Sequence, residues 1–305
     1  MKRQEITLPD GVRTTAEWFG ADVAAPKAVI AFLPALGVSV EYYRGFAQAW
    51  ASRGYRVAAL EMRGMKHSSV RDVKRENFGY REILRTDLPA LLARVRAEAA
   101  MAPFYLAGHS LGGQFALLHA ARHREHIDGV VVIAGGSNYY NSMPSAGARF
   151  RRRAAVRLVR SVNSALGYFP GHKLGFGGRQ PRSMIADWTH EALTGKYRLT
   201  GDATDYDAAL ATIAVPVIFV SLSGDPLVPS SCASFLARKL AAARLTQVEL
   251  QARDLGLPRF HHFRWVRTPE PILDAIERWA GTEAHVGIEK TNPLLASIRN
   301  VAGSQ

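Results

Sequence analysis

The sequence has 305 residues, enough for one large α/β domain that carries an insertion or for two ordinary domains. A hydrophobic content of 48% is typical of a globular protein with a sizeable core, and the single cysteine, Cys232, excludes an intrachain disulfide and is interpreted as a packed small hydrophobic residue. The net charge of +13 is compatible with a nucleic acid, an acidic membrane surface or an anionic substrate as partner. It is equally compatible with an origin in an arginine-rich proteome, in which case the charge indicates no partner.

Strand and helix patterns alternate along the first part of the chain. Residues 5–8 and 13–19 are predicted to form a hairpin, because Pro9-Asp10-Gly11 between them is a turn sequence. The apolar runs at residues 28–33 and 56–61 are typical of strands buried on both faces of a parallel sheet. Further helices or strands are predicted at residues 42–52, 84–99, 104–107, 111–122 and 129–134.

Residues 138–206 interrupt this alternation, since they contain no clear strand and are frequent in Gly and Arg. The alternation resumes with predicted elements at residues 216–222, 231–243 and 246–250. A final helix is predicted from Thr268, as N-cap, to just before Gly281. This order predicts an α/β fold with a mostly parallel central sheet flanked by helices and an inserted, largely helical lid. The expected division is core at 1–137, lid at 138–206, core at 207–282 and a C-terminal tail at 283–305.

The segment Gly108-His109-Ser110-Leu111-Gly112 has the G-x-S-x-G pattern of a nucleophile elbow. In such a strand-to-helix turn the serine hydroxyl stands clear of the sheet, and the helix N-terminus favours a developing oxyanion. The pattern arises by chance in roughly one chain in ten of this length. Its position directly between a predicted strand and a predicted helix favours Ser110 as a nucleophile over a structural glycine-rich turn.

A serine hydroxyl needs a base, and the base needs an orienting group. Asp225 follows the strand predicted at 216–222, although a Gly-Asp-Pro turn can also be purely structural. After the last predicted strand, His261 and His262 are both candidates for the base. The chain order Ser, Asp, His is the order that accompanies this type of elbow.

The remaining histidines near the elbow are interpreted differently. His109 lies inside the elbow and is expected to pack or to line the pocket. His119, His123 and His126 lie towards or just beyond the end of the next helix, and we expect them to be mostly solvated.

Two backbone amides are expected to form an oxyanion hole. One belongs to Leu111, the residue after the nucleophile, and the other comes from the loop after the strand at 28–33. Pro34 has no N–H, so the second donor is Ala35 or Leu36, and Gly37 is expected to bend the loop.

Over about residues 5–281 the sequence resembles the α/β-hydrolase superfamily, and it is most similar to bacterial predicted hydrolases related to the serine aminopeptidase and monoglyceride-lipase-like enzymes. Residues 108–114 resemble the elbow of that group, and residues 177–180 with 187–188 look like part of its lid. Residues 262–267 resemble its catalytic-histidine segment, which favours His262 over His261.

The resemblance has three departures. Glu61 stands where the usual Asp-x-Arg-Gly-x-Gly-x-Ser loop has Asp, Met65 and Lys66 stand where it commonly has His and Gly, and Pro34-Ala35 replaces a frequent His-Gly. None of them removes Ser110, Asp225 or His262. The resemblance implies hydrolysis through an acyl-enzyme without any cofactor or metal, and it leaves the substrate open.

The predicted lid carries eleven Lys or Arg and four acidic residues, so its net charge is +7. Helical spacing places Ala155, Leu158, Val162 and Leu166 on one face and Arg149, Arg153, Arg157 and Arg160 on another. The basic face is either simply solvated or binds an anionic substrate or membrane surface. No nucleic-acid module appears, so we do not expect a nucleic acid as partner.

Three functions are compatible with these residues. The first is a serine hydrolase that acts on a small-molecule or lipid-like ester, thioester or amide. The second is an acyltransferase that uses the same acyl-enzyme. The third is a non-catalytic binding protein on this fold, although a binding protein does not need Ser110, Asp225 and His262 together. Residues 1–5 are not followed by the apolar stretch of a signal peptide, so we expect a cytoplasmic protein.

Overall fold

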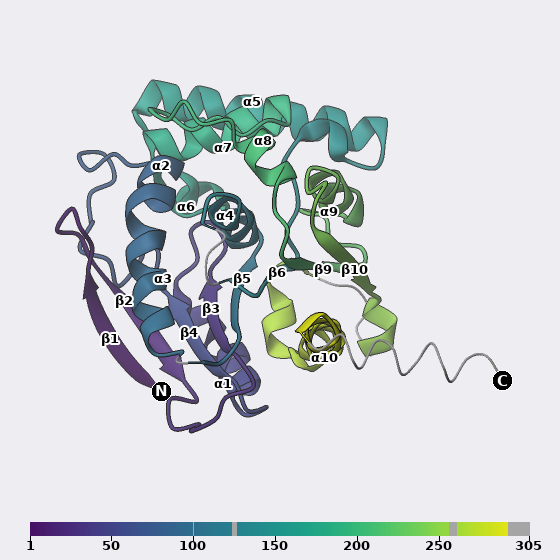
Figure 1. The fold of residues 1–305 in the computed structure, drawn as a ribbon. Helices are drawn as coiled ribbons and strands as arrows, with labels where there is room; N and C mark the ends of the chain where they lie inside the picture. The colour runs from purple at the N-terminus through teal and green to yellow at the C-terminus, as the bar shows by residue number, and fades with distance from the viewer. Residues whose placement is uncertain (100, 124–126, 256–260, 292–305) are drawn as a thin grey trace.

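A computed structural model describes residues 1–99, 101–123, 127–255 and 261–291. Its centre is an eight-stranded sheet with the strand order β1-β2-β4-β3-β5-β6-β9-β10 (Figure 1). The strands are β1 (Lys2–Thr7), β2 (Arg13–Phe19), β3 (Val29–Leu33), β4 (Arg56–Leu60), β5 (Phe104–His109), β6 (Gly129–Ile133), β9 (Pro216–Leu222) and β10 (Arg244–Leu250).

The pairing of these strands confirms the predicted hairpin and the mostly parallel sheet. β1 pairs antiparallel with β2, and β2 pairs antiparallel with β4. Every later pair in the sheet is parallel, from β4–β3 through β9–β10. The parallel strands therefore end at one common edge, where the loops after β3, β5 and β9 meet.

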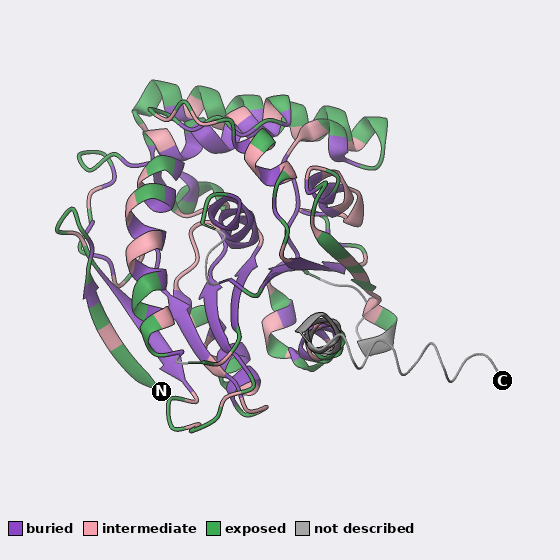
Figure 2. Cartoon of the chain, in the orientation of Figure 1, coloured by how far each residue is buried: buried purple, intermediate pink, exposed green. Residues whose placement is uncertain are grey.

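Helices cover both faces of the sheet. Val29, Ala31 and Leu33 of β3 belong to the core on the side of α3 (Leu88–Ala97) and α4 (Leu111–Ala120). Ile30 and Phe32 belong to the core on the other side, with α1 (Arg44–Ala51) and α10 (Glu270–Thr291). All five residues of β3 are buried (Figure 2), as a continuous apolar run predicts for a strand between two helical layers.

The lid lies across the core at the top of Figure 1. Its main helix, α5 (Ala146–Leu166), begins after Ser145, whose side chain accepts a hydrogen bond from the Ala148 N–H, and ends at Gly167 in the left-handed conformation. The prediction that this insertion contains no strand is wrong, because two short strands pair antiparallel within it. The rest of the lid comprises β7 (Tyr168–Pro170), α6 (Gly171–Leu174), β8 (Arg179–Pro181) and α7 (Arg182–Thr194).

Several helix boundaries differ from the prediction. The helix expected at 84–99 is a continuous stretch of α2 (Tyr80–Glu82), a π-helical turn (Ile83–Asp87) and α3, with Pro89 in the first turn of α3. The last helix does not end before Gly281 but runs to Thr291. Gly281 is not among the glycines with positive φ, so it continues the helix instead of ending it. Residues 292–305 of the predicted tail lie outside the described residues.

The remaining elements are short. They are α8 (Tyr206–Ala211), α9 (Ser230–Ala237) and the 3₁₀ helices η1 (Val40–Tyr43), η3 (Tyr140–Ser142), η4 (Ala252–Leu255) and η5 (Arg264–Arg267). Among the helices of the described residues, none combines the length and the apolar character needed to cross a membrane.

Candidate active site

Ser110 lies in a sharp turn between β5 and α4. Its backbone angles, φ 54° and ψ −117°, fall in a region that residues with a side chain rarely adopt. The turn is held in place because the Ser110 N–H donates to the carbonyl of Ile133 at the end of β6, at 2.9 Å. The strain is the backbone geometry that the elbow motif predicts.

The two glycines of the motif are required by close backbone contacts. A Cβ on Gly108 would lie 2.2 Å from the carbonyl carbon of Gly112. A Cβ on Gly112 would lie 2.2 Å from the carbonyl oxygen of Leu33, at the end of β3. The elbow therefore packs directly against the strand that leads into the candidate oxyanion loop.

Asp225 and His262 meet beside this turn although 37 residues separate them. His262 Nδ1 lies 2.6 Å from Asp225 Oδ2, and both side chains are buried. Asp225 Oδ1 accepts hydrogen bonds from the N–H groups of Leu227 at 2.8 Å and Val228 at 3.1 Å. These bonds fix the carboxylate, and the carboxylate in turn fixes the orientation of the imidazole.

His261 is in a different environment. Its side chain is exposed, and its Nδ1 accepts a hydrogen bond from the Phe263 N–H at 3.3 Å. Of the two candidate histidines, the structure places only His262 against Asp225 and in the wall of a pocket that Ser110 also lines.

His109 packs beneath the site instead of lining the pocket. Trp265 Nε1 donates to His109 Nε2 at 3.3 Å, so the ring proton belongs on Nδ1, which lies 2.8 Å from the Tyr43 hydroxyl. Burial, and then the nearby His262, hold the pKa of His109 well below its ordinary range, so this ring is neutral. Its ring centre lies 4.8 Å from that of His262.

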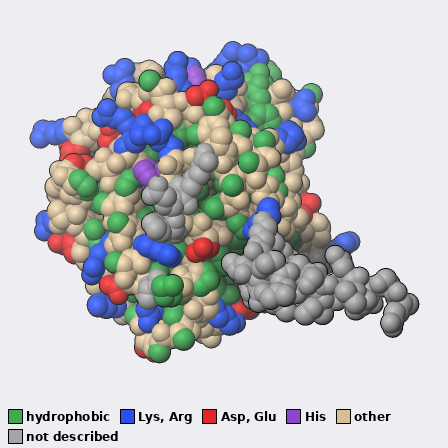
Figure 3. All heavy atoms as spheres, viewed as in Figure 1, with side chains coloured by type: hydrophobic (Ala, Val, Ile, Leu, Met, Phe, Trp, Pro, Cys, Tyr) green, Lys and Arg blue, Asp and Glu red, His purple; other side chains and the backbone are tan. Residues whose placement is uncertain are grey.

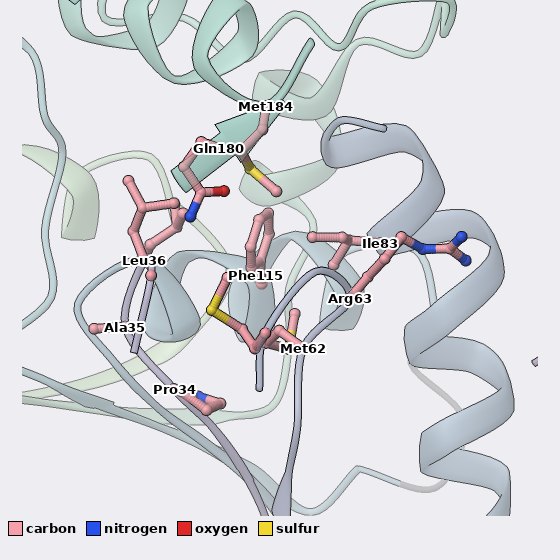
Figure 4. Close-up of a pocket in the computed structure, with 12 residues that line it drawn as sticks. Pro34, Ala35, Leu36, Met62, Arg63, Ile83, Phe115, Gln180 and Met184 are labelled. Atoms are coloured by element: carbon pink, nitrogen blue, oxygen red, sulfur yellow. The ribbon is translucent and has the colours of Figure 1, made fainter. Parts of the chain in front are cut away.

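The same network reaches the candidate oxyanion loop. The Ala35 N–H donates to the Tyr43 hydroxyl at 3.1 Å, so this donor is already engaged, and Leu36 is the candidate whose N–H Tyr43 leaves open. Leu111 is the first residue of α4, and the first N–H groups of a helix have no intrahelical partner. Behind the loop, Leu36, Met62 and Phe115 are among the residues that line a cavity of about 20 Å³, which is too small for a substrate (Figure 4).

Gly37 connects this loop to the lid. Its φ is +75°, and a Cβ at this position would lie 2.2 Å from the carbonyl oxygen of Gly177. The expected bend at Gly37 is confirmed, and the reason for it includes a close contact with the lid segment 177–180 that the family resemblance singled out.

A pocket of about 700 Å³ opens between the core edge and the lid. Ser110, Leu111, Ala35, Leu36 and His262 line it from the core. Most of its lid wall is apolar and comes from Ala155, Val156, Leu158, Val159, Val162, Phe169, Phe176 and Trp188. Three of the four residues predicted for the apolar face of the lid helix thus line the pocket, whereas the fourth, Leu166, does not.

Two buried residues of the loop after β4 and of the lid have structural partners. Glu61 accepts hydrogen bonds from the Ser39 hydroxyl at 2.7 Å and the Val40 N–H at 3.3 Å, and burial raises its pKa. Glu191 of α7 is buried and accepts from the Ser137 hydroxyl and from the Asn138 N–H at 2.9 Å. Glu191 thus links α7 of the lid to the segment that follows β6. No motif around Glu191 in the sequence predicts this link.

The prediction that His119 is solvated is wrong. The α4 side chain is only 5% exposed, its Nδ1 has no hydrogen-bond partner, and burial lowers its pKa to about 3. His123 is exposed and stacks on it, and His126 lies outside the described residues. Cys232 is fully buried beside Ser142, as predicted.

The mostly parallel sheet, with β5 leading through the strained serine turn into α4, is the α/β-hydrolase fold. A family model described as serine aminopeptidase, S33, matches residues 24–251, and the chain belongs to this family of α/β hydrolases. This confirms the resemblance to the α/β hydrolases; the matched range includes the elbow and ends before the histidine segment at 262–267.

Curated relatives are similar over part of their length. The chain is 27% identical over 175 residues to a putative non-heme haloperoxidase of Mycobacterium phage D29, covering 55% of this chain and 56% of the relative. It is 29% identical over 141 residues to a putative monoglyceride lipase of Schizosaccharomyces pombe, covering 45% and 36%. The chain thus spans about half or less of the length of these relatives.

Solved structures share the fold over nearly the whole chain. An esterase from Thermogutta terrifontis matches with a TM-score of 0.58 and 16% identity, over 93% of this chain and 99% of the esterase. A monoacylglycerol lipase from Paleococcus ferrophilus matches with a TM-score of 0.57 and 16% identity, over 88% and 99%. At this identity the likeness establishes the fold alone.

Proposed function

We propose that this α/β hydrolase cleaves carboxylic esters with Ser110 as nucleophile, His262 as base and Asp225 as the orienting group. The observation that carries the proposal is the convergence of a strained Ser110 and an Asp225-bound His262 on one pocket. The family match and the similarity to a putative monoglyceride lipase support the same reaction class.

In the first half of the reaction, Ser110 Oγ attacks the ester carbonyl carbon while His262 Nε2 accepts the hydroxyl proton. Asp225 stabilises the imidazolium that forms and keeps Nδ1 protonated. The carbonyl oxygen becomes an oxyanion that the N–H groups of Leu36 and Leu111 stabilise. His262 then gives the proton to the departing alcohol, and the acyl group stays on Ser110.

In the second half, water attacks the acyl-enzyme carbonyl, and His262 accepts a water proton. Collapse of the second oxyanion breaks the bond to Ser110, whose oxygen takes the proton back from His262. The products are the carboxylic acid and the free enzyme. In this mechanism only Ser110 forms a covalent bond to the substrate and only His262 transfers protons, while Asp225 orients His262.

The substrate class follows from the pocket. Its apolar lid wall favours an acyl or alkyl chain, because apolar surface buried against it contributes about 25 cal/mol per Å². The similarity to a putative monoglyceride lipase is in keeping with a lipid-like ester. A volume of about 700 Å³ lies within the usual range for small-molecule sites of about 300–1,000 Å³.

The test is hydrolysis of neutral p-nitrophenyl esters of increasing chain length by the wild type and by Ser110→Ala. We expect turnover by the wild type, with kcat/KM rising with chain length until the pocket is filled, and loss of on the order of 10⁴-fold or more in the variant. Ester turnover that survives in a folded Ser110→Ala would overturn the proposal.

A further inference from the structure

Arg152 is the one cationic residue among those that line the large pocket in the described part of the chain. It lies on α5, one turn before Ala155 and Val156, so it belongs to the face of the helix that turns toward Ser110 and His262. Most of the side chains around it in the lid wall are apolar.

The guanidinium has a protein partner for only part of its hydrogen-bonding capacity. Arg152 Nη2 donates a hydrogen bond to the carbonyl oxygen of Leu227. A guanidinium has five N–H donors, and within the described residues no carboxylate oxygen lies within 4.0 Å of the Arg152 nitrogens. Burial lowers the pKa of Arg152, yet an arginine remains protonated in proteins.

The acidic groups nearest to it are committed elsewhere. Asp225 and Glu191 act on Arg152 electrostatically, but Asp225 is bonded to His262 and Glu191 to Ser137 and Asn138. A partly buried cation in an apolar wall is costly unless an anion accompanies it. The described lining residues of the pocket supply no such anion, so the guanidinium is available to pair with an anionic group of a ligand that enters the pocket.

We propose that Arg152 binds an anionic oxygen group of the substrate, and that the preferred substrate is an amphiphilic ester with an apolar chain and a carboxylate or phosphate. The proposal rests on the proposed ester hydrolysis at Ser110. The planar guanidinium can pair two of its N–H groups with such an oxyanion, and Arg152 is thereby a specificity-determining residue rather than a catalytic one.

The experiment compares matched pairs of esters. One arm uses a p-nitrophenyl hemiester of a dicarboxylic acid and its neutral methyl-capped counterpart, and the other uses a 1-acylglycerol 3-phosphate and the same 1-acylglycerol. We expect the wild type to prefer the anionic member in at least one arm. Arg152→Gln should lower the ratio of the two kcat/KM values in that arm about 10- to 100-fold, the range for hydrogen bonds to a charged group.

Arg151→Gln is the matched control, because Arg151 precedes Arg152 on the same helix, is exposed and does not line the pocket. The control should keep the wild-type ratio. No preference in either arm, or the same ratio in wild type and Arg152→Gln, would overturn the proposal. An equal fall for both members of a pair would mean that Arg152 only tethers the lid to Leu227.

A binding measurement separates this proposal from the reaction. In Ser110→Ala, with Arg152 intact, octanoate and octyl phosphate should raise the melting temperature, and octanol should do so much less. Equal shifts for all three ligands would contradict the role of Arg152 even if ester hydrolysis is correct. Stronger binding of the anions, together with hydrolysis that survives the loss of Ser110, would contradict the proposed reaction alone.

Discussion

The core edge and the lid form the two walls of one pocket, but they are built on different principles. At the core edge, Ser110, Asp225 and His262 are each fixed by backbone contacts or buried hydrogen bonds. The lid instead presents one long helix whose inner face is apolar and whose outer face is charged and exposed. The core side therefore holds particular side chains in place through short contacts, whereas the lid side contributes an apolar surface and a charged surface.

This contrast predicts how each wall responds to change. A residue at the core edge has few alternative positions, because glycine contacts and buried polar partners exclude them. Residues of the outer lid face have water as an alternative partner. Mutations at the core edge should therefore affect chemistry and stability strongly, and mutations on the outer lid face should affect substrate capture weakly.

The largest effect is expected at His262. His262→Ala removes the proposed base and should lower kcat for a neutral ester by on the order of 10⁴-fold. His261→Ala should lower kcat by less than about 10-fold, because losses of 10⁴-fold are expected only for groups that act in the reaction. His261 is exposed, and its Nδ1 accepts a hydrogen bond from the nearby Phe263 N–H. Steady-state kinetics on both variants, with melting temperatures to confirm folding, measures the difference. Similar losses, or a larger one at His261, would show that the base is assigned to the wrong residue.

The next effect is expected where the two walls touch. Gly37→Ala places a Cβ about where the Gly177 carbonyl lies, whereas Gly11→Ala, also at positive φ, meets nothing within 4 Å. Both variants pay roughly 1–2 kcal/mol for the left-handed backbone. Gly37→Ala should lose about 2 kcal/mol more in urea unfolding, because overpacking forces a backbone shift. It should also lose kcat/KM, since Leu36 moves with it. Equal free energies of unfolding in the two variants would contradict a close contact between Gly37 and Gly177.

A smaller effect is expected at the buried His119 on α4. Its pKa in the folded protein is about 3, against about 6.5 in an unfolded chain. Between these values, acidification protonates only the unfolded chain, so stability falls as pH falls, by up to about 1.4 kcal/mol per pH unit. Urea unfolding at pH 7 and pH 5 should show this loss in the wild type and a smaller one in His119→Leu. The same pH dependence in both proteins would mean that His119 titrates normally in the fold.

The smallest effect is expected on the outer lid face, where Arg149, Arg153, Arg157 and Arg160 are exposed, and Figure 3 shows basic side chains gathered above α5. Replacing all four with Gln should raise KM a few-fold for an ester in anionic vesicles at low salt. The difference should vanish at 1 M salt, where the Debye length is about 3 Å. A small neutral ester should hardly respond. If neither substrate responds, this row is a solvated face.

The sequence predicted the parts of the molecule that local patterns determine. The strands at 13–19 and 216–222 match β2 and β9, because continuous or alternating apolar runs bounded by turn residues have few other solutions. The elbow at Ser110 and the bend at Gly37 were predicted because strained backbone requires particular residues.

What it missed depends on contacts between distant segments. The Glu191 link to Ser137 joins residues 54 positions apart, and His119 is buried by tertiary packing that helical spacing does not reveal. The spacing of Arg149 and Arg153 defines the exposed basic row and does not show that Arg152 faces the pocket. Its position three and four residues before the pocket-lining Ala155 and Val156 was the signal that it faces inward.

The central claim is that Ser110 is the nucleophile that the core edge holds ready, and one measurement tests it most directly. The intact protein is treated with a fluorophosphonate probe, and the modified serine is identified by peptide mass spectrometry, with His262→Ala as the control. We predict one modified residue, Ser110, with far slower labelling in the control because the proposed base is missing. Labelling at a different serine, or equal labelling of Ser110 without His262, would contradict it.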